Sequence, residues 1–416
     1  MNKTISEKII QDHTGKEVIA DDIVVSKVDF CFSHDASGPL VISRINEMGG
    51  QLSNPKKTAF FIDHAVPSSR FEISNEQSKL RNFVKKSGAI LSEAGGGICH
   101  QVMVEKYVNP GNLIVGADSH SVMGGALGAF SIGMGATDTA TAMTIGKIWL
   151  KVPKTYKVVI TGKLKNGVYS KDIILNLINT LGSDGADYKA IEFHGKAISN
   201  MDMDQRFTLS NMVIEAGAKA GLIPSDDVTL DYLKEVGRSD QFKRINSDDD
   251  AIFDKIIEID GDMLKPLIAL PHSVDNVKPV KDVEGIKIDT VFIGSCTNSR
   301  LSDLHVVASI LRKNKIKTRL IVTPSSQKVY NDSLLDGTLD VFIKAGAVVT
   351  PPGCGMCFGA LGGIPANDEK VLTTTNRNFK GRTGNPNSYT YLASPATAAV
   401  TAIEGKITDP SDYVWL

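Results

Sequence analysis

Short apolar runs that stop at a polar turn constrain the fold of this chain more than any other sequence feature. Runs of this length and composition are typical of buried strands, and open α/β sheets bind their ligands beyond the carboxyl ends of their strands. We therefore expect an α/β fold with a ligand site at the strand ends. The runs and the residues that follow them are 28–32 with His34 and Asp35, 59–62 with Asp63 and His64, Ile98 and Cys99 with His100, 113–117 with Asp118, Ser119 and His120, and 289–293 with Cys296.

The length of the chain favours several domains. At about 100–200 residues per domain, a chain of 416 residues corresponds to two to four domains. The order of the predicted strands and helices indicates three α/β domains. They are 1–163 with the histidine and aspartate loops, 164–283, and 284–416 with the cysteines.

Composition and charge favour a small-molecule partner. The net charge is -1, so there is no basic excess to hold a nucleic acid. The N-terminus lacks the apolar core of a signal peptide, and no apolar stretch approaches the roughly 20 residues that span a bilayer. We expect a cytoplasmic protein with no nucleic-acid partner and no membrane partner, whose five cysteines stay reduced and available to a metal.

The histidines at the predicted strand ends are candidates for acid–base catalysis. One histidine of this kind is more simply a core or surface residue, but four at corresponding positions favour a function. His64 lies beside Asp63, and His120 lies near Asp118. A carboxylate raises the proton affinity of a neighbouring imidazole, as acid–base catalysis requires.

A Cys-x-x-Cys motif formed by Cys354 and Cys357 lies in a glycine-rich segment, 353–359. The glycines let the backbone approach a metal centre closely. By itself the motif is compatible with half of a zinc site, a thiol redox pair or part of an iron–sulfur site. Cys296, directly after a predicted strand, is the best candidate for a third ligand.

Two further segments contain polar residues that are candidates for the functional site. Asn211 and Glu215 stand on one face of a helix predicted over 211–221, where an exposed polar stripe is the simpler alternative. Arg377 and Arg382 lie in a polar segment that suits carboxylates, because a guanidinium group binds a carboxylate through two hydrogen bonds.

A glycine-rich run at 124–138 matches a dinucleotide-binding loop only in part, since Asp138 stands where the last glycine of that motif is required. We therefore expect these glycines to allow close packing of helices against a sheet.

In this order along the chain, the motifs resemble the aconitase superfamily, and within it the large subunits of 3-isopropylmalate dehydratase and homoaconitase. The similarity extends from the first helix to the last residues. It implies an aconitase-like fold with three α/β/α domains around an iron–sulfur cluster, lacking the fourth, swivelling domain. The segments that carry the resemblance are Asp63-His64, Asp118-Ser119-His120, 294–298, 353–357 and 376–382.

The resemblance implies one [4Fe–4S] cluster held by Cys296, Cys354 and Cys357, with one iron that no cysteine binds and that acts as a Lewis acid. Cys31 and Cys99 match no cluster position and are expected to be packing thiols. His34 stands where aconitases carry glutamine, so its role stays open.

The resemblance also implies roles for the other site residues. His64 with Asp63 would protonate the departing hydroxyl group of the substrate. The residues that would order the hydroxyl group and water are His100 with Glu215, and His120 with Asp118 and Ser119. The implied substrate-binding residues are Asp35, Asn211, Asn376, Arg377 and Arg382.

The implied reaction is isomerisation of 2-isopropylmalate to 3-isopropylmalate by dehydration and rehydration, as in leucine synthesis. Homocitrate-type and 2,3-dimethylmalate-type acids are the alternatives. Because the chain stops at Leu416, where single-chain aconitases continue, we expect a separate small subunit to supply the base and part of the specificity. The alternatives from other classes are a cluster-free RNA-binding protein and a zinc-bound structural protein.

Overall fold

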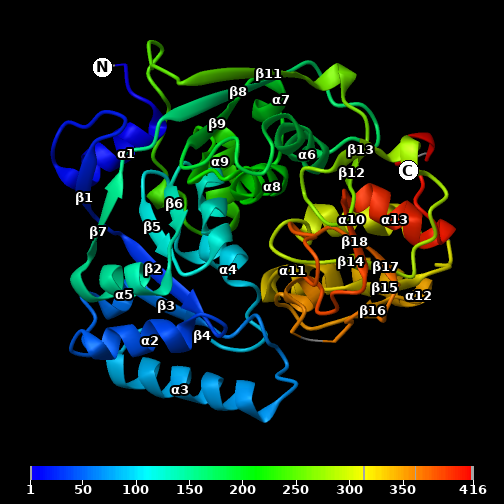
Figure 1. Cartoon of the computed structure of the whole chain (residues 1–416), viewed down its shortest axis with the longest axis horizontal. Coiled ribbons are helices and arrows are strands. Elements are labelled where there is room, and N and C mark those ends of the chain that lie inside the picture. Colours follow the sequence, from blue (N-terminus) through cyan, green and yellow to red (C-terminus); the bar gives the residue numbers. More distant parts are fainter. Residues whose placement is uncertain (1, 313, 361, 414–416) are drawn as a thin grey trace.

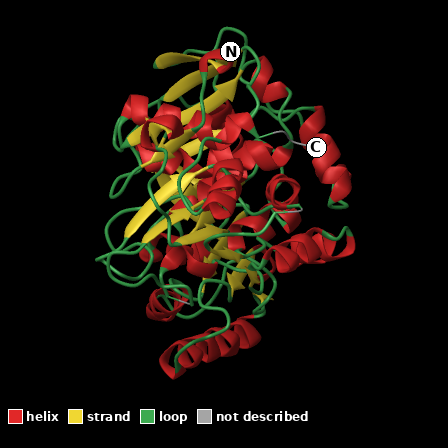
Figure 2. Cartoon of the chain, turned by 90° about the vertical axis from the view of Figure 1, so that its right-hand side faces the viewer, coloured by secondary structure: helices red, strands yellow, loops and turns green. Residues whose placement is uncertain are grey.

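Three α/β sheets form the framework of the computed structural model, which describes residues 2–312, 314–360 and 362–413. Figure 1 shows the three units in blue to cyan, in green, and in yellow to red along the chain. Helices lie on both sides of the strands (Figure 2). Each unit contains strands of the kind that the apolar runs predict, together with helices, so the α/β class is confirmed.

The first sheet is fully parallel, in the order β4-β3-β2-β5-β6. Its strands are β2 (Phe30–His34), β3 (Thr58–Phe61), β4 (Ile90–Ser92), β5 (Leu113–Gly116) and β6 (Phe130–Gly133). Its helices are α1 (Ile5–Thr14), α2 (Gly38–Glu47), α3 (Phe71–Ser87), α4 (Cys99–Lys106) and α5 (Ala136–Ile145). A separate antiparallel pair joins β1 (Ile23–Lys27) to β7 (Lys147–Lys151).

Both faces of the first sheet are buried, as a parallel sheet requires. Phe32 and Phe61 enter one apolar core, whereas their neighbours Cys31 and Phe60 enter another. The strand order reverses between β2 and β5, and ligand crevices form at such a switch point. The carboxyl ends of β2, β3 and β5 therefore open on the place where a site is expected.

The second sheet has the parallel order β10-β9-β8-β11. Its elements are β8 (Thr155–Thr161), α6 (Ser170–Leu181), β9 (Ala190–His194), α7 (Lys196–Ser199), α8 (Met203–Met212), β10 (Ala220–Leu222), α9 (Asp227–Glu235) and β11 (Lys255–Asp260). The predicted helix over 211–221 is wrong, because α8 ends at Met212 and the chain continues into β10.

The third sheet has the order β13-β12-β18-β17-β14-β15-β16, parallel except where β12 meets β13 and β18. Its strands are β12 (Leu267–Ala269), β13 (Val277–Pro279), β14 (Thr290–Ile293), β15 (Arg319–Val322), β16 (Val348–Val349), β17 (Lys370–Thr373) and β18 (Tyr389–Ala393). Its helices are α10 (Leu301–Leu311), α11 (Gln327–Leu335), α12 (Thr338–Ala345) and α13 (Pro395–Glu404).

Sheet membership differs from the predicted domain limits at two places. Strand β8 lies inside 1–163, yet it pairs with β9 and β11 of the second sheet. Strand β12 lies inside 164–283, yet it pairs with β18 of the third sheet. Hydrogen bonds between segments far apart in the sequence determine which sheet each of these two strands joins. Local composition cannot predict such pairings. The domain limits themselves stay a prediction.

Short 3-10 turns complete the framework. They are η1 (Pro55–Lys57), η2 (Ser119–Leu127), η3 (Val213–Ala216), η4 (Ser239–Gln241), η5 (Gly261–Met263), η6 (Val280–Val283), η7 (Gly355–Phe358) and η8 (Pro410–Asp412). Across residues 2–312, 314–360 and 362–413, none of the helices is long and apolar enough to cross a bilayer.

One apolar core connects the three sheets. It contains Phe32 of β2, Phe193 of β9 and Phe292 of β14, and it extends to Cys296 and Cys357. Because the cores of protein interiors are closely packed, the strand ends that surround this core are held at fixed positions.

Close packing of the first unit on the second depends on Gly125 in η2. A Cβ atom at Gly125 would lie 1.8 Å from the carbonyl oxygen of Gly221. The Gly125 carbonyl also accepts a hydrogen bond from the Ile223 amide at 3.0 Å. The packing role predicted for the glycine-rich run is confirmed at this position.

Gly125→Ala is therefore expected to lower the thermal unfolding midpoint, since overpacking a tight contact costs about 1–3 kcal/mol. Gly135→Ala is the matched control, because a Cβ atom there would meet its nearest neighbour at 3.9 Å. Calorimetry of the two variants tests the prediction. Equal midpoints for both variants would contradict it.

Candidate active site

The carboxylate of Asp118 is the centre of the histidine cluster. Its Oδ1 accepts hydrogen bonds from His100 Nε2 at 2.9 Å and from the His120 amide at 2.8 Å. Its Oδ2 lies 3.5 Å from His34 Nε2 and 4.0 Å from His64 Nε2. The four histidines predicted from separate strand ends thus meet at one carboxylate.

His64 and Asp63 form the predicted acid–base pair. His64 Nδ1 donates to Asp63 Oδ1 at 2.9 Å, and both residues are buried. Burial disfavours the charged form of His64, but the charge and hydrogen bond of Asp63 overcome this effect and raise the pKa of His64 to about 9. Burial likewise opposes the charge of Asp63, and His64 nevertheless holds the pKa of Asp63 below its ordinary value. The pair can hold a proton at neutral pH.

The carboxylate of Asp63 accepts a hydrogen bond from the first turn of α4, the helix that carries His100. Asp63 Oδ2 accepts a hydrogen bond from the Cys99 amide at 2.6 Å, in the first turn of α4. A carboxylate at this position satisfies one of the free amide groups of a helix start. The sequence-based expectation that His100 follows a strand is therefore wrong. His100 lies in the first turn of α4, and the Asp63 carboxylate stabilises the start of this helix.

His100 has a different partner from the predicted Glu215, whereas His120 keeps its predicted neighbours Asp118 and Ser119 and also bonds Glu215. His100 pairs with Asp118, whereas His120 Nε2 bonds Glu215 Oε1 at 2.9 Å. Ser119 Oγ lies 3.3 Å from His120 Nδ1. Glu215 comes from η3 of the second unit, and a contact between units cannot be read from spacing along the chain. Burial raises the pKa of Glu215, but the hydrogen bond from His120 more than offsets this, and the pKa is lowered.

Cys296, Cys354 and Cys357 are buried free thiols next to the histidine cluster. A hydrogen bond from Cys354 and the positive charge of Arg382 lower the pKa of Cys357 well below its ordinary value. Burial raises the pKa of Cys296 to about 11. A thiolate is the form that binds a metal, so Cys357 is prepared for ligation.

Amide and guanidinium groups surround the sulfur atoms. Asn211 Nδ2 lies 3.2 Å from Cys296 Sγ, and Asn376 Nδ2 lies 3.6 Å from the same atom. Arg382 Nη2 lies 3.4 Å from Cys357 Sγ. Three of the residues predicted to bind substrate therefore donate to the thiols in this structure, as donors around a sulfur-ligated centre do.

Three of the buried polar atoms that have no partner within the described parts of the chain lie at the site. They are His34 Nε2, His100 Nδ1 and Arg382 Nε. Leaving a buried polar group unpaired is costly, so such groups mark a place where a ligand or water binds. Together with the three thiols and their donors, this set fits an iron–sulfur cluster with a polar ligand beside it.

Asp35, which was predicted to bind substrate, holds a loop in this structure. Its Oδ1 accepts from the His64 amide at 2.9 Å, and its Oδ2 accepts from the Ala65 amide at 3.2 Å and from Gln77 Nε2 at 2.9 Å. The possible ligand atoms of His34, Asp35, Asp63 and His64 lie within 4.8 Å of one another. Because N–H donors occupy the carboxylate oxygens, this group is a hydrogen-bonded framework for the loop.

Arg377 and Arg382 reach the site from the third unit. Arg377 Nε donates to Glu215 Oε1 at 2.8 Å, and its side chain is 25% exposed. Arg382 packs over the rings of Phe358 and Phe379. The predicted arginine pair thus lies at the site, and both side chains are partly buried.

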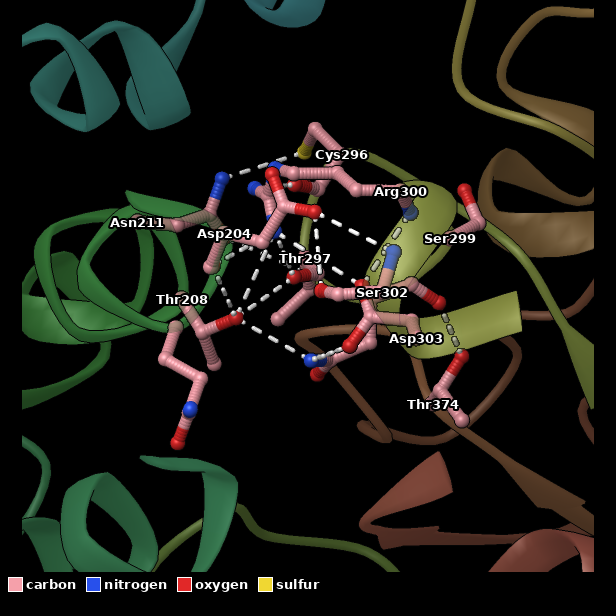
Figure 3. Close-up of polar contacts among 12 residues, drawn as sticks. Asp204, Thr208, Asn211, Cys296, Thr297, Ser299, Arg300, Ser302, Asp303 and Thr374 are labelled. Atoms are coloured by element: carbon pink, nitrogen blue, oxygen red, sulfur yellow. Dashed lines mark hydrogen bonds and ion pairs between the residues drawn. The ribbon is translucent and has the colours of Figure 1, made fainter. Parts of the chain in front are cut away.

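Sequence reasoning missed Arg300, which lies behind Cys296 and is 1% exposed. Figure 3 shows its side chain among groups from α8 and from the turn after β14. Its Nη1 donates to the Thr297 carbonyl at 2.8 Å and to the Asp204 carbonyl at 3.1 Å, and its Nη2 donates to the Cys296 carbonyl. The only sequence signal is its place four residues after Cys296.

Sequence reasoning also missed Lys171 on α6. Its Nζ donates to the carbonyls of Thr374 and Thr375 at 2.7 and 2.6 Å. Burial lowers the pKa of Lys171 to about 7. A lysine followed by apolar residues at helical spacing gives no sign that it is buried, because the fold places these carbonyls over it.

Comparison with known proteins identifies relatives over the whole chain. The model of the aconitase family (aconitate hydratase) matches residues 7–284 and 278–405. The 3-isopropylmalate dehydratase large subunit of Elusimicrobium minutum is 51% identical, with all of both chains covered. The corresponding large subunit 1 of Thermotoga maritima is 52% identical, again over all of both chains. The methanogen homoaconitase large subunit of Methanocaldococcus jannaschii is 46% identical over 98% of this chain and all of that protein.

A solved structure agrees on the fold. Aconitase X of Thermococcus kodakaraensis aligns with a TM-score of 0.52 over 90% of this chain and 89% of that one, at 14% identity. At this identity the match supports the fold alone. The family model and the full-length relatives carry the assignment, and by them the chain belongs to the aconitase family.

Proposed function

We propose that this chain is the large, catalytic subunit of a hydro-lyase that isomerises 2-isopropylmalate to 3-isopropylmalate by dehydration and rehydration. The observation that carries the proposal is the meeting of four histidines at Asp118 beside three buried thiols. The relatives of about 50% identity are named for this reaction. The homoaconitase relative makes a homologous tricarboxylate the second candidate.

Family membership implies an iron–sulfur cluster. We propose the [4Fe–4S] type, held by Cys296, Cys354 and Cys357, so that one iron has no cysteine ligand. When bound, this cluster supplies a Lewis acid for the substrate hydroxyl group. The amides of Asn211 and Asn376 would donate hydrogen bonds to the sulfur atoms.

His64 is the proton donor of the proposed reaction. Its Nδ1 is tied to Asp63, so only Nε2 is free to face the substrate. The raised pKa keeps the imidazole protonated at neutral pH, and Asp118 opposite Nε2 stabilises the cation. Transfer of the Nε2 proton to the departing hydroxyl group yields water and a neutral His64 that keeps its bond to Asp63.

His100 and His120 order the oxygen atoms of the substrate and of water. Burial lowers the pKa of His100, so its imidazole is neutral and presents a lone pair at Nδ1 while Nε2 bonds Asp118. Glu215 joins His120 to Arg377 and thereby fixes the direction of the Arg377 guanidinium group. Arg377 is then available for a substrate carboxylate, which it suits by its two parallel donors.

A separate small subunit is the proposed partner, because the relatives are named large subunits. It would contribute the base that removes the carbon-bound proton. It would also contact the isopropyl group, at which the candidate substrates differ.

Replacing Cys296, Cys354 or Cys357 by serine is expected to remove the brown colour and visible absorption of the anaerobically purified chain, together with its bound iron and sulfide. Serine is a poor ligand for iron where cysteine thiolate is a good one. Cys31→Ser is the matched control, since Cys31 is an equally buried thiol whose pKa burial raises to about 12. A colourless Cys31→Ser with a brown Cys357→Ser would refute the ligand assignment, and a colourless wild-type chain containing zinc would refute the cluster.

The substrate and the partner are tested together. The chain alone is expected to bind iron but to turn over 2-isopropylmalate negligibly, and addition of its cognate small subunit should restore the activity. Rates on 3-isopropylmalate, homocitrate and 2,3-dimethylmalate can be compared by the ultraviolet absorbance of the unsaturated acids. An unpaired third carboxylate costs several kcal/mol in an apolar pocket, so we expect at least an about hundredfold preference. A preference of this size for homocitrate would make homoaconitase the function, and full activity of the chain alone would exclude the two-subunit proposal.

A further inference from the structure

His34 has no role in the reaction as described so far, yet it lies inside the site. It is the last residue of β2 and is 4% exposed. Its ring stacks on the ring of His64, with the centroids 3.8 Å apart and the planes inclined by 16°. It therefore contacts the proton donor directly.

The hydrogen bonding of His34 determines which nitrogen carries its proton. The Ala36 amide donates to His34 Nδ1 at 3.2 Å, so Nδ1 presents a lone pair. The proton must then lie on Nε2, as in any imidazole whose Nδ1 accepts. Nε2 is buried and has no hydrogen-bond partner among the residues that the structure describes. Its N–H group is thus a free donor inside the site.

Two imidazoles point at the same small space. His34 Nε2 lies 3.5 Å from Asp118 Oδ2, and His64 Nε2 lies 4.0 Å from that oxygen. Both separations exceed the usual length of an N–H···O bond. Because the two rings are stacked, one oxygen atom at this edge can accept from both Nε2–H groups.

The stack also restrains His64. A single side-chain hydrogen bond, from Nδ1 to Asp63, would leave the ring free to turn about that bond. Phe358 meets the His64 ring edge to face, with centroids 5.6 Å apart, and His34 covers one face of it. The plane of the ring, and hence the direction of Nε2, is set by these two neighbours.

We propose that His34 is a second hydrogen-bond donor to the departing hydroxyl oxygen and the positioning residue for His64. It keeps its own Nε2 proton throughout, while His64 transfers the proton that makes the hydroxyl group leave as water. This inference rests on the proposed function, because it needs a substrate with a hydroxyl group to be eliminated. No other histidine of the site combines stacking on His64 with a free Nε2–H.

Three substitutions separate the two parts of the role in the reconstituted, cluster-loaded enzyme. His34→Phe keeps an aromatic ring for stacking but loses the donor. His34→Gln loses the ring but carries an amide N–H near the position of Nε2, whereas the shorter His34→Asn does not reach it. His194→Phe is the matched control, since His194 also ends a strand, β9, but lies outside the site.

His34→Phe is expected to lower kcat about 10- to 100-fold, the range of one hydrogen bond to a charged group. KM should change little and the cluster absorbance per chain should be retained. His34→Gln should keep a clearly higher kcat than His34→Asn, a rescue that a purely structural role would not produce. His194→Phe should leave kcat unchanged.

The outcomes distinguish this inference from the proposed function. If wild type is active and His34→Phe keeps kcat within about twofold of it, or if the Gln and Asn variants are equal, the inference about His34 is overturned and the function stands. If His34→Phe does not fold, the comparison of Gln with Asn decides. If wild type prefers another hydroxy acid, only the proposed substrate fails and the variants are measured on that acid. A wild-type enzyme inactive on all three acids overturns both.

Discussion

The hydrogen bonds of Asp63 hold the site together. Oδ1 accepts from His64, Oδ2 accepts from the Cys99 amide at the start of α4, and the backbone carbonyl accepts from the Cys354 amide at 2.9 Å. One residue thus joins the proton donor, the helix that bears His100 and the cysteine loop of the third unit. The partial positive charge of the helix start and the imidazolium group both stabilise the carboxylate, which explains why its pKa is low although it is buried.

Each of the following buried charged groups lies beside groups of opposite charge or beside polar groups that stabilise it. Asp118 faces four imidazoles, Glu215 lies between His120 and Arg377, and the guanidinium group of Arg300 is surrounded by carbonyls. A buried charge that loses its partner costs several kcal/mol. Substitutions within one of these groups of residues should therefore affect its other members, and their effects should not add.

The place of the site follows from how the three units pack. The first sheet supplies the histidines at its switch point, the second supplies Asn211 and Glu215, and the third supplies the cysteines and Arg377. The three cysteines are part of the apolar core that runs through the three sheets. Gly125 packs closely against Gly221 where the first two units meet, and His120 bonds Glu215 between the same two units.

The sequence by itself determined the α/β class, most strand positions and the residues gathered at the site. Strand runs are local patterns of apolar residues, and Cys296, Cys354 and Cys357 stand in motifs that the family resemblance identifies. Only the tertiary structure decided the partners within the site. His100 pairs with Asp118, and the Asp63 carboxylate stabilises the start of the helix that carries His100. His120 bonds Glu215 of the second unit, and Asp35 accepts hydrogen bonds from the loop at His64. Arg300 and Lys171 likewise found partners only in the folded chain. The physical reason is that spacing along the chain reports which face of an element a residue occupies, whereas a hydrogen bond between units depends on how those elements pack.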